Sequence, residues 1–322
     1  EASSDGEGGG PESPVWPPSF GSALAQGPRE YMEDALVVHP DARCGFLFAA
    51  LFDGHEGAAA STWLRDNLYK YFSAGVDAAG CDISPPPAAD SKGVAKPQSA
   101  SPLLEQTMAE AFNEADKRLL KELAKRPPPD CFSGSCATAV LVRQDRILAA
   151  AVGDSRAVLA RGGKAIDLTP EHRVYGPSQV ARREVQRIKD AGGWVQQGRV
   201  CGILAVSRAF GDWEFKGGRQ QLREELLEDY PQARKATMEN ELVIPTPDVS
   251  EVARDPRDEF VVVASDGLWD VCSSRNAAVL VAKELKAHGD AERAAEAMVA
   301  YATKKKTQDN VAVVVIDLRG SA

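Results

Sequence analysis

The sequence contains little histidine and no CxxC pair. Only four of its 322 residues are histidine, and its six cysteines stand at positions 44, 81, 131, 136, 201 and 272. Zinc sites made of Cys and His have characteristic short spacings, and none occurs here. We therefore expect free thiols of a reducing compartment. A redox-active pair of Cys131 and Cys136 is the alternative.

The chain is also poor in positive charge and in long apolar runs. Lys and Arg number 38 against 47 Asp and Glu, which gives a net charge of −9. Nucleic acids and anionic membrane surfaces attract basic faces, so we expect neither as the main partner. No run approaches the roughly 18 apolar residues that a membrane-spanning helix needs. The expectation is a monomer with no transmembrane span.

Composition divides the chain into a leader and one folded region. Residues 1–18 are rich in Gly, Pro, Ser and Glu and predict a disordered leader without the features of a signal peptide. Because the sequence starts at Glu1, a processed product that has lost a targeting peptide is an open alternative. Residues 19–320 predict a single domain, interrupted by a low-complexity loop at 74–101 and a charged insertion at 216–242. This insertion and the basic helix expected within 176–194 are either solvated surface or a flap that contacts substrate.

Periodicity predicts an α+β chain with helices packed on antiparallel sheets. Apolar residues recur at helical spacing in four segments, namely 60–72, 104–120, 276–288 and 291–303. Short Val- and Ala-rich runs predict strands at 46–52, 137–142, 146–152, 156–160, 260–264 and 311–317. The connections at 143–146 and 160–165 are short enough for hairpins, which favours antiparallel pairing. Two further strand-like runs flank the charged insertion, at 203–210 and 245–252.

Four aspartates stand at the ends of these apolar runs: Asp53, Asp154, Asp266 and Asp309. A carboxylate at the tip of a buried strand must be hydrated or metal-bound. Several acidic oxygens at one edge of a sheet make a site for hard divalent cations such as Mg²⁺ or Mn²⁺. The pattern therefore suggests a metal-dependent hydrolase, although any single Asp could equally belong to a turn.

Further motifs place other chemical groups in the same order along the chain. Arg29 precedes the adjacent carboxylates Glu33 and Asp34, and the segment DGHEG at 53–57 puts His55 beside the expected site. The motifs SGSCAT, GDSR, AVSRAFGD, SDGLWD and QDN follow, starting at residues 133, 153, 205, 265 and 308. In this order and spacing they closely resemble the protein phosphatase 2C family of metal-dependent Ser/Thr phosphatases, from Arg29 to Asn310.

The resemblance implies a β-sandwich of two antiparallel sheets flanked by antiparallel helix pairs, with two Mn or Mg ions at one end. Asp53 would bridge the ions, the Gly54 carbonyl would complete one of them, and Asp266 and Asp309 would hold the other. Glu33 and Asp34 would act through water, and Asp154 would hold a third, weaker ion. The implied reaction is hydrolysis of phosphoserine or phosphothreonine by a hydroxide that bridges the two metals.

The remaining roles implied by the resemblance concern substrate. Arg29 would bind the phosphate of a phosphorylated protein, and its planar guanidinium suits bidentate binding. His55 would protonate the leaving oxygen, which suits a side chain that titrates near neutrality. Residues of 172–194, such as His172 and Arg173, would contact the substrate.

Three stretches resemble a narrower, thylakoid-associated branch of this family in chloroplasts. They begin at Thr169, Glu184 and Leu242. That likeness implies phosphothreonine of the light-harvesting antenna of photosystem II as substrate during state transitions. It also implies a location on the stromal face of the thylakoid, with peripheral membrane association. A different signalling substrate in the cytosol or nucleus is the alternative.

Two residues depart from the family's pattern, and neither is an implied ligand. Glu56 stands where a small residue is usual, and Cys136 replaces a common Thr. A catalytically silent scaffold is the competing hypothesis, but such proteins typically lose a metal ligand. A nuclease or phosphodiesterase would need a basic substrate track, which the net charge of −9 does not favour.

Overall fold

The computed structural model describes residues 16–78, 98–100 and 102–320, and within them two antiparallel sheets face each other. The first sheet has the strand order β1-β14-β13-β7-β8, and the second has β2-β3-β5-β6-β12-β4 with β11 paired to β5. The strands are β1 Ser19–Ala25, β2 Ala35–Ala42, β3 Phe46–His55, β4 Gln98–Ser99, β5 Gly134–Val142, β6 Arg146–Val152, β7 Arg156–Arg161, β8 Lys164–Asp167, β11 Phe210–Gly211, β12 Asp248–Ala253, β13 Asp258–Ala264 and β14 Val311–Asp317.

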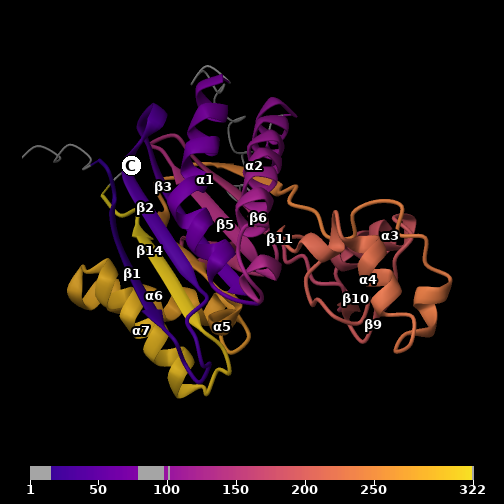
Figure 1. Cartoon of the computed structure of the whole chain (residues 1–322). Coiled ribbons are helices and arrows are strands. Elements are labelled where there is room, and N and C mark those ends of the chain that lie inside the picture. The colour runs from indigo at the N-terminus through magenta and orange to yellow at the C-terminus, as the bar shows by residue number, and fades with distance from the viewer. Residues whose placement is uncertain (1–15, 79–97, 101, 321–322) are drawn as a thin grey trace, which may run out of the picture.

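Two helix pairs cover the outer faces of the sheets (Figure 1). α1 Ala59–Ala78 and α2 Pro102–Leu123 pack against the second sheet, and α6 Ser274–His288 and α7 Ala291–Lys304 against the first. Ser273 caps α6 by accepting a hydrogen bond from the Asn276 amide, and Gly289 ends it with a φ of 65°. The predicted β-sandwich with flanking helix pairs is therefore confirmed.

The apolar runs are continuous because the central strands are buried on both faces. In β3, Phe46, Phe48 and Phe52 belong to the core under α1 and α2. Leu47 and Leu51 point the other way, into the core between the two sheets. Side chains alternate between the faces of a strand, so a strand between two cores needs no polar position.

A lobe made of residues 174–243 projects from one edge of the sandwich (Figure 1). It contains α3 Gln179–Asp190, α4 Arg219–Glu225 and the short hairpin of β9 Val195–Gln196 with β10 Arg199–Val200. Its apolar residues, among them Ile188, Trp194 and Leu242, form a core of their own. The segments 176–194 and 216–242 are thus parts of one folded unit.

Short helical turns complete the described structure. They are η1 Arg43–Gly45, η2 Asp130–Phe132, η3 Trp213–Phe215 and η4 Pro231–Arg234, and α5 Asp266–Trp269 follows β13. In the part of the chain that the structure describes, no helix is long and apolar enough to cross a membrane.

Some local predictions differ from the structure. Helix α1 continues to Ala78, so the predicted loop at 74–101 begins as helix, and most of that loop lies outside the described residues. The strand-like run at 203–210 forms only isolated bridges and the start of β11 at Phe210, because Leu204, Val206 and Ala209 pack into the lobe's core rather than into a sheet. Of the predicted leader only residues 16–18 are described, and Trp16 packs against the core between the sheets.

The expectation of six free thiols is wrong for Cys44, which is disulfide-bonded. Absence of a CxxC spacing could not exclude this bond, because a disulfide can join cysteines at any sequence separation. Cys131, Cys136, Cys201 and Cys272 are free, so the alternative pair of Cys131 and Cys136 does not form a disulfide. The prediction for Cys81 lies outside the described residues.

Candidate metal centre

The four predicted aspartates come from both sheets and meet at one end of the sandwich. β3 and β6 both pair antiparallel with β5, so they run in the same direction and bring Asp53 and Asp154 to one edge. Asp266 follows β13 and Asp309 precedes β14, the neighbouring strand. Ligand oxygens of Asp53, Asp154 and Asp266 all lie within 4.8 Å of one another.

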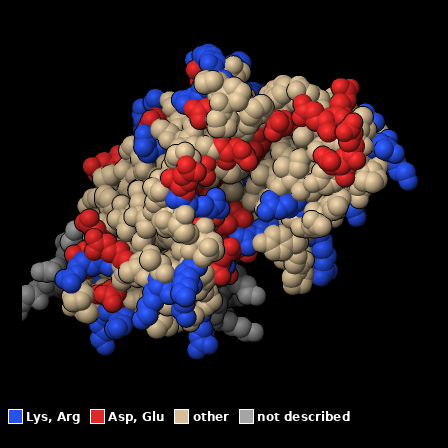
Figure 2. Space-filling model, turned by 60° about the horizontal axis from the view of Figure 1, so that its bottom comes forward, with Lys and Arg blue, Asp and Glu red and all other residues tan. Residues whose placement is uncertain are grey.

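The aspartates line a cleft of about 570 Å³ between the sandwich and the lobe. Arg29, His55 and Asp212 contribute to the same cleft, and Arg199, Ile203 and Leu204 of the lobe form its other wall. Figure 2 shows acidic side chains gathered in this hollow between the sandwich and the lobe, with basic side chains at its margins. A substrate that reaches the carboxylates must therefore contact the lobe as well.

Burial and mutual repulsion raise the pKa of several carboxyls at this centre. Burial, together with the charges of Asp266 and Asp34, raises the pKa of Asp53 well above its ordinary value. Burial and the charge of Asp154 raise the pKa of Asp266 to about 8. A divalent cation would remove this repulsion, and a set of oxygen donors without Cys or His suits Mg²⁺ or Mn²⁺. The residues present therefore fit the metal ions that the family implies.

Glu33 and Asp34 lie behind the aspartates. The Glu33 carboxylate accepts a hydrogen bond of 2.6 Å from the Gly57 amide, and Asp34 accepts one of 2.7 Å from the Ser265 hydroxyl. Burial raises the pKa of Asp34 to about 7, and the nearby charges of Asp309 and Glu33 add to this rise. Neither residue lines the cleft, unlike Gly54, which does.

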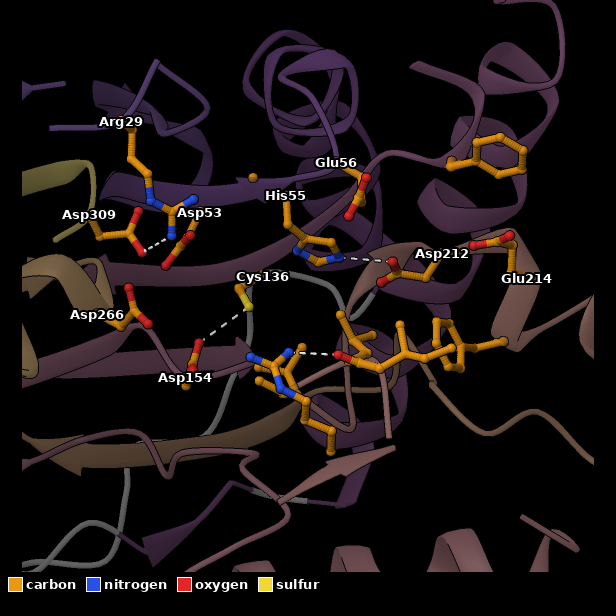
Figure 3. Close-up of a pocket in the computed structure, with 18 residues that line it drawn as sticks. Arg29, Asp53, His55, Glu56, Cys136, Asp154, Asp212, Glu214, Asp266 and Asp309 are labelled. Atoms are coloured by element: carbon orange, nitrogen blue, oxygen red, sulfur yellow. Dashed lines mark hydrogen bonds and ion pairs between the residues drawn. The ribbon is translucent and has the colours of Figure 1, made fainter. Parts of the chain in front are cut away.

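Arg29 approaches the centre from the turn between β1 and β2. Its Nη2 donates to Asp309 Oδ2 at 2.5 Å, and its Nε donates to the Gln308 carbonyl at 3.1 Å. The Arg29 side chain is 49% exposed, so it lies at the open side of the cleft. Figure 3 shows its guanidinium beside Asp309 and Asp53.

His55 stands between the aspartates and a fifth acid, Asp212 (Figure 3). Its Nε2 lies 2.8 Å from Asp212 Oδ1. Burial disfavours the charged imidazole, but the charge and hydrogen bond of Asp212 outweigh it, and the pKa of His55 is raised. Gly134 makes room for this pair, because a Cβ there would lie 2.2 Å from His55 Nε2 and 2.4 Å from Asp212 Oδ1.

The structure places the two residues predicted from 172–194 differently from each other. Arg173 reaches the metal centre, where its Nε donates to Asp154 Oδ2 at 2.9 Å. His172 is fully buried at the root of the lobe, with its Nε2 3.6 Å from Asp248 Oδ2, and it does not line the cleft. His172 is thus packed in the protein interior, whereas Arg173 makes polar contacts with the carboxylates of the centre.

Two further acids stand at the ends of motifs, and the sequence predicted no role for either. Asp212 follows Gly211 at the end of the motif AVSRAFGD, and Asp270 ends SDGLWD. Asp212 is buried beside His55, and Asp270 accepts a hydrogen bond of 2.9 Å from Arg173. The repeated placement of an Asp at a motif's last position was the available signal.

The two departures from the family's pattern both lie in the cleft. Glu56 has a positive φ of 52°, a backbone conformation that residues other than Gly rarely adopt. Cys136 donates its Sγ–H to Asp154 Oδ1 at 3.5 Å, and burial raises the pKa of this thiol well above its ordinary value. It is therefore a neutral group beside the carboxylates.

Comparison with known proteins identifies the family and agrees with the fold. The family model described as protein phosphatase 2C matches residues 19–311. "Protein phosphatase 2C 57" of Arabidopsis thaliana is 35% identical over 312 residues, covering 94% of this chain and 76% of the relative. "Probable protein phosphatase 2C 2" of Oryza sativa subsp. japonica is 32% identical over 306 residues, covering 92% and 70%.

A solved structure shares the fold. The serine-threonine phosphatase 2C from Toxoplasma gondii superposes with a TM-score of 0.69 at 20% identity, covering 95% of this chain and 97% of that one. Together with the motifs and the carboxylate centre, these likenesses show that the chain belongs to the protein phosphatase 2C family of metal-dependent protein serine/threonine phosphatases.

Proposed function

We propose that this phosphatase hydrolyses phosphothreonine of light-harvesting antenna proteins, using the cleft between the sandwich and the lobe. The observation that carries the catalytic part is the convergence of four strand-end aspartates with Arg29 and His55 in one cleft. Asp53, Asp266, Asp309 and the Gly54 carbonyl would hold two Mn or Mg ions, and Asp154 a third. When bound, such ions neutralise phosphoryl oxygens and lower the pKa of water.

Arg29 binds the phosphate in this proposal. Its partner Asp309 is itself an expected metal ligand, so phosphate and Asp309 are alternative partners of the guanidinium. Because the Arg29 side chain is 49% exposed, it can turn from the carboxylate toward a phosphate without crossing packed residues. Two parallel N–H donors then hold two phosphate oxygens, an arrangement that Lys cannot reproduce.

His55 supplies the proton to the leaving oxygen of the threonine. The hydrogen bond to Asp212 occupies Nε2 and leaves Nδ1 for the substrate. Asp212 also favours the protonated ring, which is the form that a general acid requires. Asp212 therefore acts through His55, as a positioning residue.

The choice of substrate rests on the lobe. The stretches that resemble the thylakoid-associated branch begin before and inside the lobe, and Arg199, Ile203 and Leu204 of the lobe face the metal centre across the cleft. Residues of a stretch that resembles this branch thus stand where a peptide beside the phosphothreonine would lie. We place the enzyme on the stromal face of the thylakoid, as a monomer peripherally associated with the membrane. The alternatives are another signalling substrate in the cytosol or nucleus, and a silent scaffold.

One assay tests the metal-dependent phosphatase activity, and a second tests the choice of antenna proteins as substrate. Hydrolysis of a phosphothreonine peptide should require Mn²⁺ or Mg²⁺, and both a chelator and Asp53→Asn should abolish it. Activity that survives either treatment would contradict the metal-dependent mechanism, and no activity in the unmodified chain would favour the scaffold. In isolated thylakoids the enzyme should dephosphorylate antenna proteins faster than photosystem core subunits. Equal rates would refute the antenna substrate while leaving the phosphatase activity intact.

A further inference from the structure

The guanidinium of Arg173 is fixed against one side of the carboxylate centre. Its Nε donates to Asp154 Oδ2 at 2.9 Å, and its Nη2 donates to Asp270 Oδ1 at 2.9 Å and to Asp266 Oδ2 at 3.3 Å. Its Nη1 donates to the Tyr175 hydroxyl at 2.7 Å, and the guanidinium carbon lies 5.6 Å from the centre of that ring. Three carboxylates and a phenol thus hold one cation.

Arg173 differs from Arg29, the other arginine at the centre. Arg29 contacts a single carboxylate and is 49% exposed, whereas Arg173 contacts three and is 16% exposed. Arg29 can therefore exchange partners at little cost. Arg173 cannot leave without exposing like charges to one another, because Asp154, Asp266 and Asp270 would then face each other without a cation.

These contacts use oxygens that a metal ion would need. Asp154 belongs to the group of three aspartates whose oxygens lie within 4.8 Å of one another, and so does Asp266. A cation on the lobe side of this group would draw on Asp154 and on its neighbour Asp270. Arginine stays charged at any ordinary pH, so it cannot yield these oxygens by losing a proton.

We propose that Arg173 is an internal cation that competes with a divalent ion for Asp154 and Asp270. Its presence keeps the lobe side of the centre a weak metal site, while the Asp53 side, which it does not contact, stays open to tight binding. The inference deepens the proposed function and rests on the metal centre described there.

The same competition couples metal loading to the lobe. Arg173 forms an antiparallel bridge with Val206, and the preceding amide of His172 donates to the Gly153 carbonyl at 2.8 Å. Arg173 therefore stands at the junction where the lobe leaves the sandwich. An ion that displaces the guanidinium removes its bonds to three sandwich carboxylates, and we expect the lobe to become more mobile as a result.

The test measures Mn²⁺ binding to the full chain. Equilibrium dialysis and the electron paramagnetic resonance signal of free Mn²⁺ both report the amount bound. In Arg173→Gln the weakest site should tighten about tenfold, a typical size for coupling between sites. The tight sites should change less, because Arg173 reaches them only through its 3.3 Å contact with Asp266. Arg173→Lys keeps a charge that reaches fewer carboxylates, so it should give a smaller gain. Arg182→Gln, an exposed arginine of the same lobe, is the matched control and should match the unmodified protein.

Each outcome decides a separate question. Unchanged or weaker binding at the weakest site in Arg173→Gln would overturn the proposal. If that variant does not fold, as judged by circular dichroism, Arg173→Lys decides instead, and an unchanged weak site there overturns it. Absence of any tight Mn²⁺ site in the unmodified chain would instead refute the proposed metal centre. Faster proteolysis of the lobe at Mn²⁺ concentrations that fill the weak site would support the coupling, and unchanged proteolysis would refute it.

Discussion

The contact between His55 and Asp212 determines which ring nitrogen is available for chemistry. Asp212 occupies Nε2 at 2.8 Å, and Gly134 leaves just enough space for both side chains. Any side chain at position 134 would separate them. The glycine in SGSCAT is thus required by a pair of residues far from it in the sequence.

Replacing Asp212 by Asn should slow hydrolysis of a phosphothreonine peptide about 10- to 100-fold, a part of what a general acid usually contributes. An aryl phosphate with a good leaving group needs little protonation, so its hydrolysis should fall much less. The ratio of kcat on the two substrates is the measurement, with Asp190→Asn, an exposed residue of α3, as the control. Equal losses on both substrates would indicate a structural role instead.

Glu56 carries a backbone strain that glycine would relieve. With a φ of 52°, its replacement by Gly should raise the free energy of unfolding by about 1 kcal/mol. Urea unfolding measures the change. Glu56→Ala removes the same carboxylate but keeps the strain, so it should show no gain. A gain of similar size in both variants would trace the effect to the charge.

At the scale of elements, a buried ion pair joins helix α2 to the lobe. Lys216 Nζ donates to Asp116 Oδ2 at 2.7 Å, and the Gly211 amide donates to the other carboxylate oxygen at 2.8 Å. Lys216 is 1% exposed, so the pair is closed to solvent. Burial raises the pKa of Asp116 despite the opposing charge of Lys216.

Lys216→Met should lower the free energy of unfolding by about 3 kcal/mol, because it leaves the Asp116 charge buried without an opposite charge beside it. The double variant with Asp116→Asn should recover part of the loss, since neither group is then charged. Urea unfolding of the single and double variants gives the coupling energy. For comparison, Lys125→Met removes an exposed partner of Glu122 and should cost much less, because solvent screens that pair. Similar losses of unfolding free energy in Lys216→Met and Lys125→Met would contradict the conclusion that burial makes the pair of Lys216 and Asp116 important for stability.

At the scale of the whole molecule, the metal-free protein should lose stability as pH rises. The folded pKa values of Asp34 and Asp266 are about 7 and about 8, both raised, so the native state binds more protons than the unfolded chain. Stability from a raised pKa is complete below the ordinary value and is lost as pH passes the folded one. The loss should approach about 1 kcal/mol per pH unit for each group, from about pH 4 to about pH 7 for Asp34 and from about pH 4 to about pH 8 for Asp266.

Mn²⁺ should reverse this dependence, because metal binding replaces the protons on the carboxylates. Urea unfolding at several pH values, with Mn²⁺ and with a chelator, measures both slopes. A metal-free stability that rises across the same interval would contradict the mutual repulsion of the carboxyls.

The sandwich and its aspartates were predictable because strong local patterns encode them. The runs of β3, β13 and β14 are apolar throughout, and each has an Asp at the relevant end. β2 was missed, since it contains Pro40, whereas the strand-like run at 245–252 overlaps most of β12. The lobe's core and the contacts of Arg173 depend on how distant segments pack, and no spacing in the sequence shows that.

The separate core of the lobe has a consequence for engineering. Apart from Cys136, the buried apolar residues of that core come from positions 174–243, so few of them are shared with the sheets. The four aspartates and His55, in contrast, all lie outside this segment. A lobe exchanged as a unit from another member of the family, with Asp212 retained beside His55, should therefore transfer peptide preference to an unchanged catalytic centre. Cys136 and Arg173 lie where the sandwich meets the lobe, so the exchanged lobe must be compatible with both side chains.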